Sequence, residues 1–566
     1  MIITADELPA DTVLSAHVAV VGAGPAGIST ALELAGAGFD VLLIESGYTK
    51  FDGGVQQLSE AAEWDRRRHT PMSLAVRRQL GGASVVWGGR CVPYDAVDFD
   101  YRPYISDVSW PVTYQDLSRY FQRACDWLQC GRPVFDATQM RHLPPALVPG
   151  LPDGTVSTAT FERWSLPTDF AREYGDALKR SRRIRVLTGL TCTRVNVQAG
   201  QNQVTDLSCR ALDGKRVSIR ARAYVLAAGG LETTRLMLTS PGPHGAPVGD
   251  QAGHLGRWYM GHVLGSIATV RLNAPPKATV LDYERDIDGT YVRRRFSISR
   301  ESQLERSLPN FVAWLANPNP ADARHRNGAL SLTYLALRSP LGKHITSESR
   351  RLSLTGVNIP QAAYHYAVRT PISSHILNLA RDCPSITRLA VEFSARYFPP
   401  HGRRAPSFFA RSGENCYPFQ YHGEQIPNRQ SRVHLAADRD ALGMPKLRID
   451  MKFSEQDVDG VLRSHEIWDA YLRLHDRGRL EYVTDDPRAA VWLQMGGGGH
   501  QLGTTRMAAS DRDGVVDAQL AVHGMSNLFV ASSSVFLTSS QANPTFMIIV
   551  FALRLADRLK LLLPGL

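Results

Sequence analysis

Residues 17–27 read HVAVVGAGPAG, and this stretch decides the fold. Its compact apolar run, rich in Val, is typical of a buried strand, and the glycines that follow indicate a tight turn. Residues 28–34 take up a helical pattern, and residues 39–45 form a second apolar strand that ends in Glu45. Strand, glycine turn, helix and strand in this order predict a βαβ unit and an α/β fold.

The glycines Gly22, Gly24 and Gly27 have the spacing of a dinucleotide-binding turn. Glycines there let the backbone approach a pyrophosphate, which meets the positive end of the following helix. Glu45 lies close to the position, ~20 residues downstream, where an acid binds a ribose hydroxyl in such units. An acid there suits a free 2′-hydroxyl, so the pattern favours FAD or NAD over NADP. The alternative is a strand-to-helix turn without a ligand.

Composition narrows the class of protein further. The net charge is +10, but the basic clusters are short and scattered, so they indicate solvated surface rather than a nucleic-acid interface. The positive net charge leaves an anionic substrate as an open alternative. Seven Cys without a CxxC pair indicate a reducing compartment, and we expect a cytoplasmic protein. The apolar run at residues 546–553 is too short to span a bilayer. No zinc-binding motif occurs, so we expect no metal.

A chain of 566 residues exceeds what one core usually organises, so we expect two joined domains. We predict a discontinuous Rossmann-like nucleotide-binding domain made of residues 11–110, 183–262 and 488–566. Residues 111–182 and 263–487 are expected to form an inserted, strand-rich α+β domain that binds the substrate.

Three local predictions go with this organisation. Residues 114–128 should form one helix, because an amphipathic pattern follows Trp110-Pro111. Residues 80–89, with four glycines, should form a loop where backbone approaches a ligand closely. The proline-rich residues 131–169 are expected to be irregular.

His500 and Asn543 are the candidate catalytic residues. Glycines flank His500 on both sides and leave its imidazole uncrowded, as a proton acceptor near neutral pH must be. Asn543 precedes Pro544, which favours an extended conformation and suits a fixed hydrogen-bond donor. A histidine on the surface and an ordinary helix cap are the alternative interpretations. Aromatic residues such as Trp314 and Phe419 could stack on a ligand ring, although core packing is the better interpretation for most of them.

Several motifs together resemble the glucose-methanol-choline (GMC) flavoprotein oxidoreductases. They are the glycine turn with Glu45, the GGASVVWGG loop at 81–89, the run AAGG at 227–230 and HQLGTTRM at 500–507. The segments VVD at 515–517, NLFVA at 527–531 and ANPT at 542–545 follow in the order and spacing of the family's C-terminal signature. Within the family, the loop and the His–Asn pairing look most like the pyranose oxidase and sugar dehydrogenase branch.

This resemblance implies a cofactor, its site and a reaction. FAD would be bound by Gly22, Gly24, Pro25, Ala26, Gly27, Glu45, Ser46, Arg78, Gly82, Ser84, Trp87, Gly88, Cys192, Ala228, Ser532, Asn543, Pro544 and Thr545. Ser532 stands where the family commonly has Asp or Gly. Val86 matches the histidine that binds flavin covalently in pyranose oxidases, so we expect non-covalent FAD. His500 would take the hydroxyl proton of an alcohol while hydride leaves for the flavin.

The expected substrate is a small hydroxylated molecule, a carbohydrate or glycoside whose secondary hydroxyl becomes a ketone. Oxygen or another electron acceptor would close the cycle. The alternatives are oxidation of a non-sugar alcohol, use of FAD without net oxidation, and an FAD-binding structural protein. The sequence predicts no oligomeric state.

Overall fold

The computed structural model describes residues 1–165, 168–198, 200–346, 348–355, 370–397 and 403–563. Its main sheet has the order β1-β8-β3-β2-β11-β10-β9, and β21 pairs with β11. The strands are β1 (Ile2–Thr4), β2 (Thr12–Val21), β3 (Val41–Ile44), β8 (Ile184–Thr188), β9 (Thr191–Val197), β10 (Val204–Arg210), β11 (Arg216–Leu226) and β21 (Leu528–Val530). Pairing is parallel from β1 through β11 and to β21, while β10 and β9 are antiparallel. The predicted α/β fold is confirmed.

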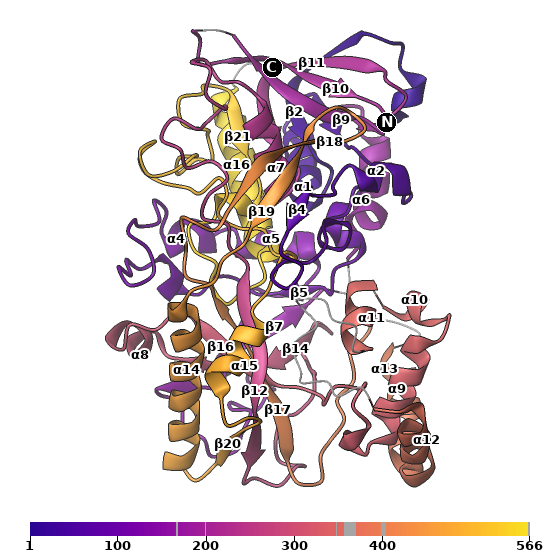
Figure 1. The fold of residues 1–566 in the computed structure, drawn as a ribbon, viewed down its shortest axis with the longest axis vertical. Helices are drawn as coiled ribbons and strands as arrows, with labels where there is room; N and C mark the ends of the chain where they lie inside the picture. Colours follow the sequence, from indigo (N-terminus) through magenta and orange to yellow (C-terminus); the bar gives the residue numbers. More distant parts are fainter. Residues whose placement is uncertain (166–167, 199, 347, 356–369, 398–402, 564–566) are drawn as a thin grey trace.

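Helices cover this sheet because its strands are apolar on both faces. Val18–Val20 and Leu42–Leu43 are entirely buried. The helices of this part are α1 (Pro25–Gly36), α5 (Phe121–Leu128), α6 (Phe170–Arg180), α7 (Gly230–Thr239) and α16 (Thr545–Leu562). The apolar helix α16 packs against both α1 and α5. Segments from the two ends of the chain therefore share one core, visible in the upper half of Figure 1.

The second body is built on a six-stranded sheet with the order β20-β12-β17-β16-β15-β6. Its strands are β6 (Val156–Ser157), β12 (His262–Leu272), β15 (Phe296–Ile298), β16 (Phe311–Leu315), β17 (Cys416–Glu424) and β20 (Gly478–Tyr482). One face carries Phe311, Phe419 and Tyr421 and packs in a common core with Trp468 of α14 (Glu455–Leu474). The helix α15 (Pro487–Gln494) lies beside α14 in the lower half of Figure 1. The predicted second, sheet-rich domain is confirmed.

Two smaller sheets connect these bodies. One has the order β13-β14-β7-β5 and the other β18-β19-β4. The strands are β4 (Glu63–Trp64), β5 (Arg90–Cys91), β7 (Phe161–Trp164), β13 (Glu284–Arg285), β14 (Tyr291–Arg294), β18 (Arg432–Arg439) and β19 (Pro445–Asp450). A group of helices, α9 (Gly328–Arg338), α12 (Ile372–Arg381) and α13 (Cys383–Tyr397), lies at the lower right of Figure 1. The remaining helices are α2 (Gly53–Gln57), α3 (Met72–Ala75), α4 (Tyr114–Ser118), α8 (Arg300–Glu305), α10 (Gly342–Ile345) and α11 (Glu348–Leu354).

Two local expectations differ from the structure. The helix expected over 114–128 is divided into α4 and α5 by a turn at Arg119 and Tyr120. The segment 131–169, expected to be irregular, contains the strands β6 and β7. Strand β7 has no apolar alternation, because Glu162 and Arg163 are as completely buried as its aromatic residues. Ion pairs across the sheet stabilise it instead, and such pairs leave no periodic pattern in the sequence.

The domain boundaries stay predictions. Strands of the main sheet lie within residues 2–44, 184–226 and 528–530, and the short β1 precedes residue 11. In the part of the chain that is described, no helix combines the length and the apolar character needed to cross a membrane.

Candidate active site

The glycine turn lies where the parallel strands end. Gly22 follows β2 with a φ of +100°, and a Cβ added there would lie 2.5 Å from the carbonyl oxygen of Ala227. Only glycine fits this left-handed, crowded position. A Cβ on Gly27 would lie 1.9 Å from the Gly22 oxygen, so helix α1 packs directly onto the turn. The predicted cofactor residues Gly22, Gly27 and Ala228 are thus brought together at the N-terminus of α1.

Glu45 is joined to this turn by backbone hydrogen bonds. Its Oε2 accepts from the amide of Ala23, and its Oε1 accepts from the amide of Gly47, both at 2.8 Å. Burial raises the pKa of Glu45, although the two amide donors and Arg78 oppose that effect. Each carboxylate oxygen has a second lone pair that could accept a ribose hydroxyl.

The second glycine-rich loop lies against the first. The amide of Gly81 donates to the Ala23 oxygen at 2.8 Å. A Cβ on Gly82 would lie 2.9 Å from the Cα of Gly24, whereas a Cβ on Gly88 would meet no atom within 4 Å. The backbones of the two glycine-rich turns therefore lie against each other without side chains between them, and such bare backbone can approach a pyrophosphate closely. These residues fit a bound FAD.

Side chains of the second glycine-rich loop bind it to the segment around Thr168 and Phe170. Ser84 Oγ accepts from the Phe170 amide at 3.0 Å, and Trp87 Nε1 donates to the Thr168 oxygen at 3.0 Å. Pro25 and Thr545 are the first residues of α1 and α16, so Ala26 and Pro544 lie at helix N-termini as well.

Other predicted cofactor residues have protein partners. Arg78 donates to Ser46 Oγ at 2.7 Å and pairs with Glu232 at 2.5 Å. Cys192 lies opposite Cys209 in the antiparallel pair of β9 and β10. Ser532 caps a short 3-10 turn by accepting from the amide of Ser534 at 3.1 Å. Their roles in binding FAD stay predictions.

Two histidines from neighbouring strands lie beside the predicted His500. In the register of β12 and β17, His422 pairs with Leu264 and His262 pairs with Glu424. Since alternate residues share a face, His262 and His422 are diagonal neighbours on the face opposite to Phe419. Their rings stack with centroids 4.5 Å apart.

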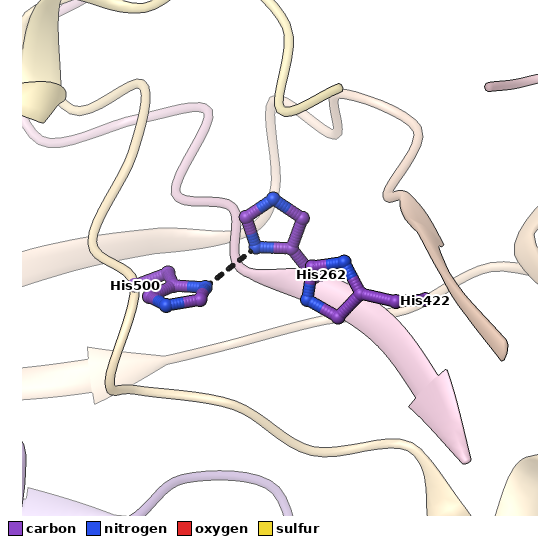
Figure 2. Close-up of side chains that lie close together, drawn as sticks. All are labelled: His262, His422 and His500. Carbon is purple, nitrogen blue, oxygen red and sulfur yellow. Dashed lines mark hydrogen bonds between the residues drawn. The ribbon is translucent and has the colours of Figure 1, made fainter. Parts of the chain in front are cut away.

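His500 reaches this pair from the C-terminal segment. Its Nδ1 lies 2.9 Å from Nδ1 of His262, as Figure 2 shows. His262 Nε2 lies 3.1 Å from the carbonyl oxygen of Ser539, and His422 Nδ1 lies 2.6 Å from that of Gln541. The segment before α16 is therefore bonded to the same sheet face that receives His500.

All three imidazoles are neutral near pH 7. Burial, together with the charge of Arg90, lowers the pKa of His500 to about 4. Burial and neighbouring positive charge lower the pKa of His262 and of His422 well below the usual range. An uncharged imidazole has one free lone pair, which a general base needs.

Asn543 is oriented by an ion-pair network. Arg90 NH1 donates to Asn543 Oδ1 at 2.9 Å. Arg90 Nε also donates to Glu162, a carboxylate with no exposed surface. Glu162 binds Arg293 Nε at 2.6 Å with its other oxygen. The register of the strands explains why Arg90 and Arg293 both reach Glu162. Arg90 is opposite Trp164 and Arg293 is opposite Glu162, so all these side chains lie on one face of the small sheet.

Trp314 connects this network to the six-stranded sheet. The guanidinium carbon of Arg293 lies 4.1 Å from its ring centroid, and that of Arg90 lies 5.0 Å away. The indole Nε1 donates to Gln420 at 3.1 Å, on the face that also carries His422. Trp314 thus belongs to the site, whereas Phe419 packs in the core.

Sequence reasoning missed His262, His422, Arg90 and Glu162. A histidine close to Phe419 and Tyr421 in the segment that forms β17 was one available signal. The association of Arg90 with Asn543 joins positions 453 residues apart, and no local pattern indicates it.

The histidines could also be considered as metal ligands. Among the described residues they form a group whose nitrogen atoms all lie within 4.8 Å of one another. The group contains no carboxylate, and the positive charge of Arg90 acts on all three rings. Three imidazoles can ligate zinc without a carboxylate, but the positive charge of Arg90 would oppose a divalent cation there. The geometry favours proton chemistry, and the absence of a metal stays a prediction.

Two family models match the chain. The model of the pyridine nucleotide-disulphide oxidoreductases matches residues 16–260, which include the glycine turn and Glu45. The model of the GMC oxidoreductases matches residues 427–552, which include both His500 and Asn543. Residues 427–552 thus match the GMC oxidoreductases, and a nucleotide-binding family model matches the first half of the chain. The protein is an FAD-dependent oxidoreductase that acts on CH–OH groups, so the predicted GMC resemblance, cofactor and enzyme class are confirmed.

Two known dehydrogenases are similar to the chain. The chain is 22% identical to 2-methyl-1,2-propanediol dehydrogenase of Mycolicibacterium austroafricanum over 615 residues, which cover 95% of this chain and 94% of that protein. Dehydrogenase str4 of Strobilurus tenacellus is 36% identical over 80 residues, which are 14% of this chain and 13% of that one.

Solved structures show the same fold. Pyridoxine 4-oxidase from Mesorbium loti superposes with a TM-score of 0.50 at 17% identity, covering 96% of this chain and 98% of that one. A fungal aryl-alcohol oxidase superposes with a TM-score of 0.51 at 14% identity, covering 98% and 99%.

Proposed function

We propose that this enzyme oxidises a secondary hydroxyl of a sugar or glycoside to a ketone. His500 would accept the hydroxyl proton, and Asn543 would donate a hydrogen bond to the hydroxyl oxygen. The observation that carries the proposal is that both side chains are held by buried partners at one place. Arg90 binds Asn543, and its charge also acts on His500.

The protonation states suit these roles. His500 is neutral at pH 7, so its imidazole can take a proton. Because Asn543 Oδ1 accepts from Arg90, its Nδ2 is the atom that can donate to an alcohol oxygen. FAD, when bound, supplies the acceptor for the hydride that leaves the substrate carbon. Oxygen or another electron acceptor would then restore the oxidised cofactor.

The residues around the site support a hydroxyl-rich substrate. Gln420 and Arg90 contact the indole of Trp314, and Arg90 also donates to Asn543. Amide and guanidinium groups are hydrogen-bonding partners that suit the hydroxyl groups of a sugar. We further propose that residues 11–110, 183–262 and 488–566 bind FAD, while residues 111–182 and 263–487 contact the substrate.

A non-sugar alcohol is the second candidate. It is favoured by the similarity, over 95% of the chain, to a protein named for a small branched diol. Anaerobic mixing of the enzyme with a panel of alcohols separates the two. A sugar or glycoside should bleach the oxidised flavin, whereas bleaching by diols alone would select the second candidate.

His500→Ala tests the chemistry. The variant should keep FAD but reduce it ~10²-fold more slowly or worse, the usual scale for loss of a positioned general base. His523→Ala is a matched control, because His523 lies in the same C-terminal segment and its Nε2 contacts the carbonyl of Ala508 at 3.2 Å. Equal reduction rates in His500→Ala and the unchanged enzyme would show that another residue takes the proton.

A further inference from the structure

The hydrogen bonds of His262 determine which of its nitrogens carries the proton. Its Nε2 lies 3.1 Å from the backbone carbonyl oxygen of Ser539. A carbonyl oxygen can only accept, so Nε2 of His262 must carry hydrogen and donate. Burial keeps the second proton off this ring at neutral pH, because it lowers the pKa of His262 well below the usual range. The carbonyl of Ala542 also acts on this ring, but the hydrogen bond described for Nδ1 is the one to His500. With the proton on Nε2, Nδ1 of His262 is a bare lone pair.

The bare Nδ1 of His262 then sets the tautomer of His500. The two Nδ1 atoms lie 2.9 Å apart, so one must donate to the other. Since His262 can only accept there, His500 carries its single proton on Nδ1. The lone pair of His500 is consequently on Nε2, which faces away from His262 on the ring.

We propose that His262 is a positioning residue that fixes His500 in the Nδ1–H tautomer, with Nε2 as the proton acceptor. This inference rests on the proposed function. In the proton transfer, the substrate O–H bond breaks, an N–H bond forms at Nε2, and the Nδ1–H bond to His262 is kept. Without His262, the other tautomer would place hydrogen on Nε2 and no lone pair towards the substrate.

The carbonyl of Ser539, which accepts from His262, is held in a fixed position. Ser539 Oγ accepts from the amide of Gln425 at 2.8 Å, next to the end of β17. His262 is the first residue of β12, which pairs with β17. Acceptor and histidine are thus held by the same sheet, so the direction of the Nε2–H bond is set by the fold and not by a mobile side chain.

His422 provides a matched comparison. It is as deeply enclosed as His262, stacks on it, and donates from Nδ1 to the Gln541 carbonyl at 2.6 Å. Its ring faces that of His500 edge-on, with centroids 6.2 Å apart, and the described hydrogen bonds do not join the two. Both histidines are therefore buried and stacked, but the described hydrogen bond to His500 is made by His262.

Nuclear magnetic resonance on FAD-loaded protein labelled with 15N-histidine tests the tautomer directly. The His500 signals, assigned by their loss in His500→Ala, should show a protonated Nδ1 and a bare Nε2. His262→Ala should abolish this preference. His262→Asn should keep it, because Asn Oδ1 occupies nearly the position of Nδ1 and accepts. A protonated Nε2 in the unchanged protein would overturn the proposal.

Anaerobic stopped-flow reduction gives the second readout. His262→Ala should lower the limiting rate of flavin reduction roughly 10- to 100-fold, part of the contribution of a general base, with the substrate dissociation constant changed by less than about 3-fold. His262→Asn should recover most of the rate. His422→Asn, which keeps a donor to Gln541 and removes no bond to His500, should lose less of the rate than His262→Ala. Equal losses in the His262 and His422 variants would reveal a merely structural role and overturn the proposal.

The outcomes distinguish this inference from the proposed function. If His500→Ala reduces normally, the assignment of the base fails. If His500→Ala is impaired while His262→Ala keeps both the tautomer and the rate, only the role of His262 fails. A bound metal would also overturn the role proposed for His262, because a metal on Nδ1 displaces the shared proton. It would be detected as one equivalent of Zn²⁺ that the protein retains after dialysis against a chelator and that His262→Ala loses.

Discussion

Replacing Glu162 by Gln should both destabilise the protein and slow flavin reduction. Glu162 has no exposed surface and pairs with Arg90 and Arg293. Burial opposes the charge of this carboxyl, but Arg293, Arg90 and Arg295 outweigh it and lower the pKa of Glu162. Glutamine would remove that charge and leave two enclosed guanidinium groups without their shared anion.

The size of each effect follows from this geometry. Breaking a buried ion pair by removing one partner costs about 3–5 kcal/mol, a large part of the ~5–15 kcal/mol that stabilises a typical domain. Arg90 also holds Asn543 by the 2.9 Å bond to Oδ1. Loss of the bond from Arg90 should shift the side-chain amide of Asn543. A shift of about 1 Å in a catalytic group should lower the rate of flavin reduction roughly 10- to 100-fold.

Thermal unfolding and anaerobic stopped-flow reduction measure the two effects. Glu284→Gln is the matched control, because Glu284 pairs with the buried Arg294 at 2.5 Å in the same small sheet without contacting Asn543. It should lower the melting temperature but leave the reduction rate nearly unchanged. The reasoning is wrong if Glu162→Gln reduces at the original rate, or if both variants slow reduction equally.

Two further predictions concern the cofactor and pH. Acid precipitation should release all the FAD, about one per chain, because Val86 offers no nucleophile and residues 80–90 contain no His, Cys or Tyr; yellow colour left in the pellet would contradict this. The rate of flavin reduction should be constant from about pH 8 to 5 and fall as the pH approaches about 4, because His500 loses its free lone pair on protonation. A decline that begins near pH 6.5 would show that the base is not shifted in this way.

The βαβ unit and its cofactor could be predicted because the residues that indicate them are close together in the sequence. Gly22, Gly27 and Glu45 lie in one short segment, and each is required by backbone geometry or by two backbone amides. The C-terminal residues His500 and Asn543 were found for the same reason, since their flanking glycines and proline are neighbours in sequence. The expectation of an irregular segment over 131–169 missed the short strands β6 and β7, because ion pairs and not an apolar period stabilise β7.

The sequence by itself thus determined the α/β class and the dinucleotide turn, and its resemblance to the GMC family implied FAD and the roles proposed for His500 and Asn543. Only the tertiary structure decided what surrounds them. Strand register places His262 and His422 on one face, and pairing of β5 with β7 brings Arg90 to Glu162. These contacts join residues that are far apart in the sequence through hydrogen bonds and charge, which act through space. Their consequences, a neutral His500 and an oriented Asn543, therefore follow only when the folded chain encloses them.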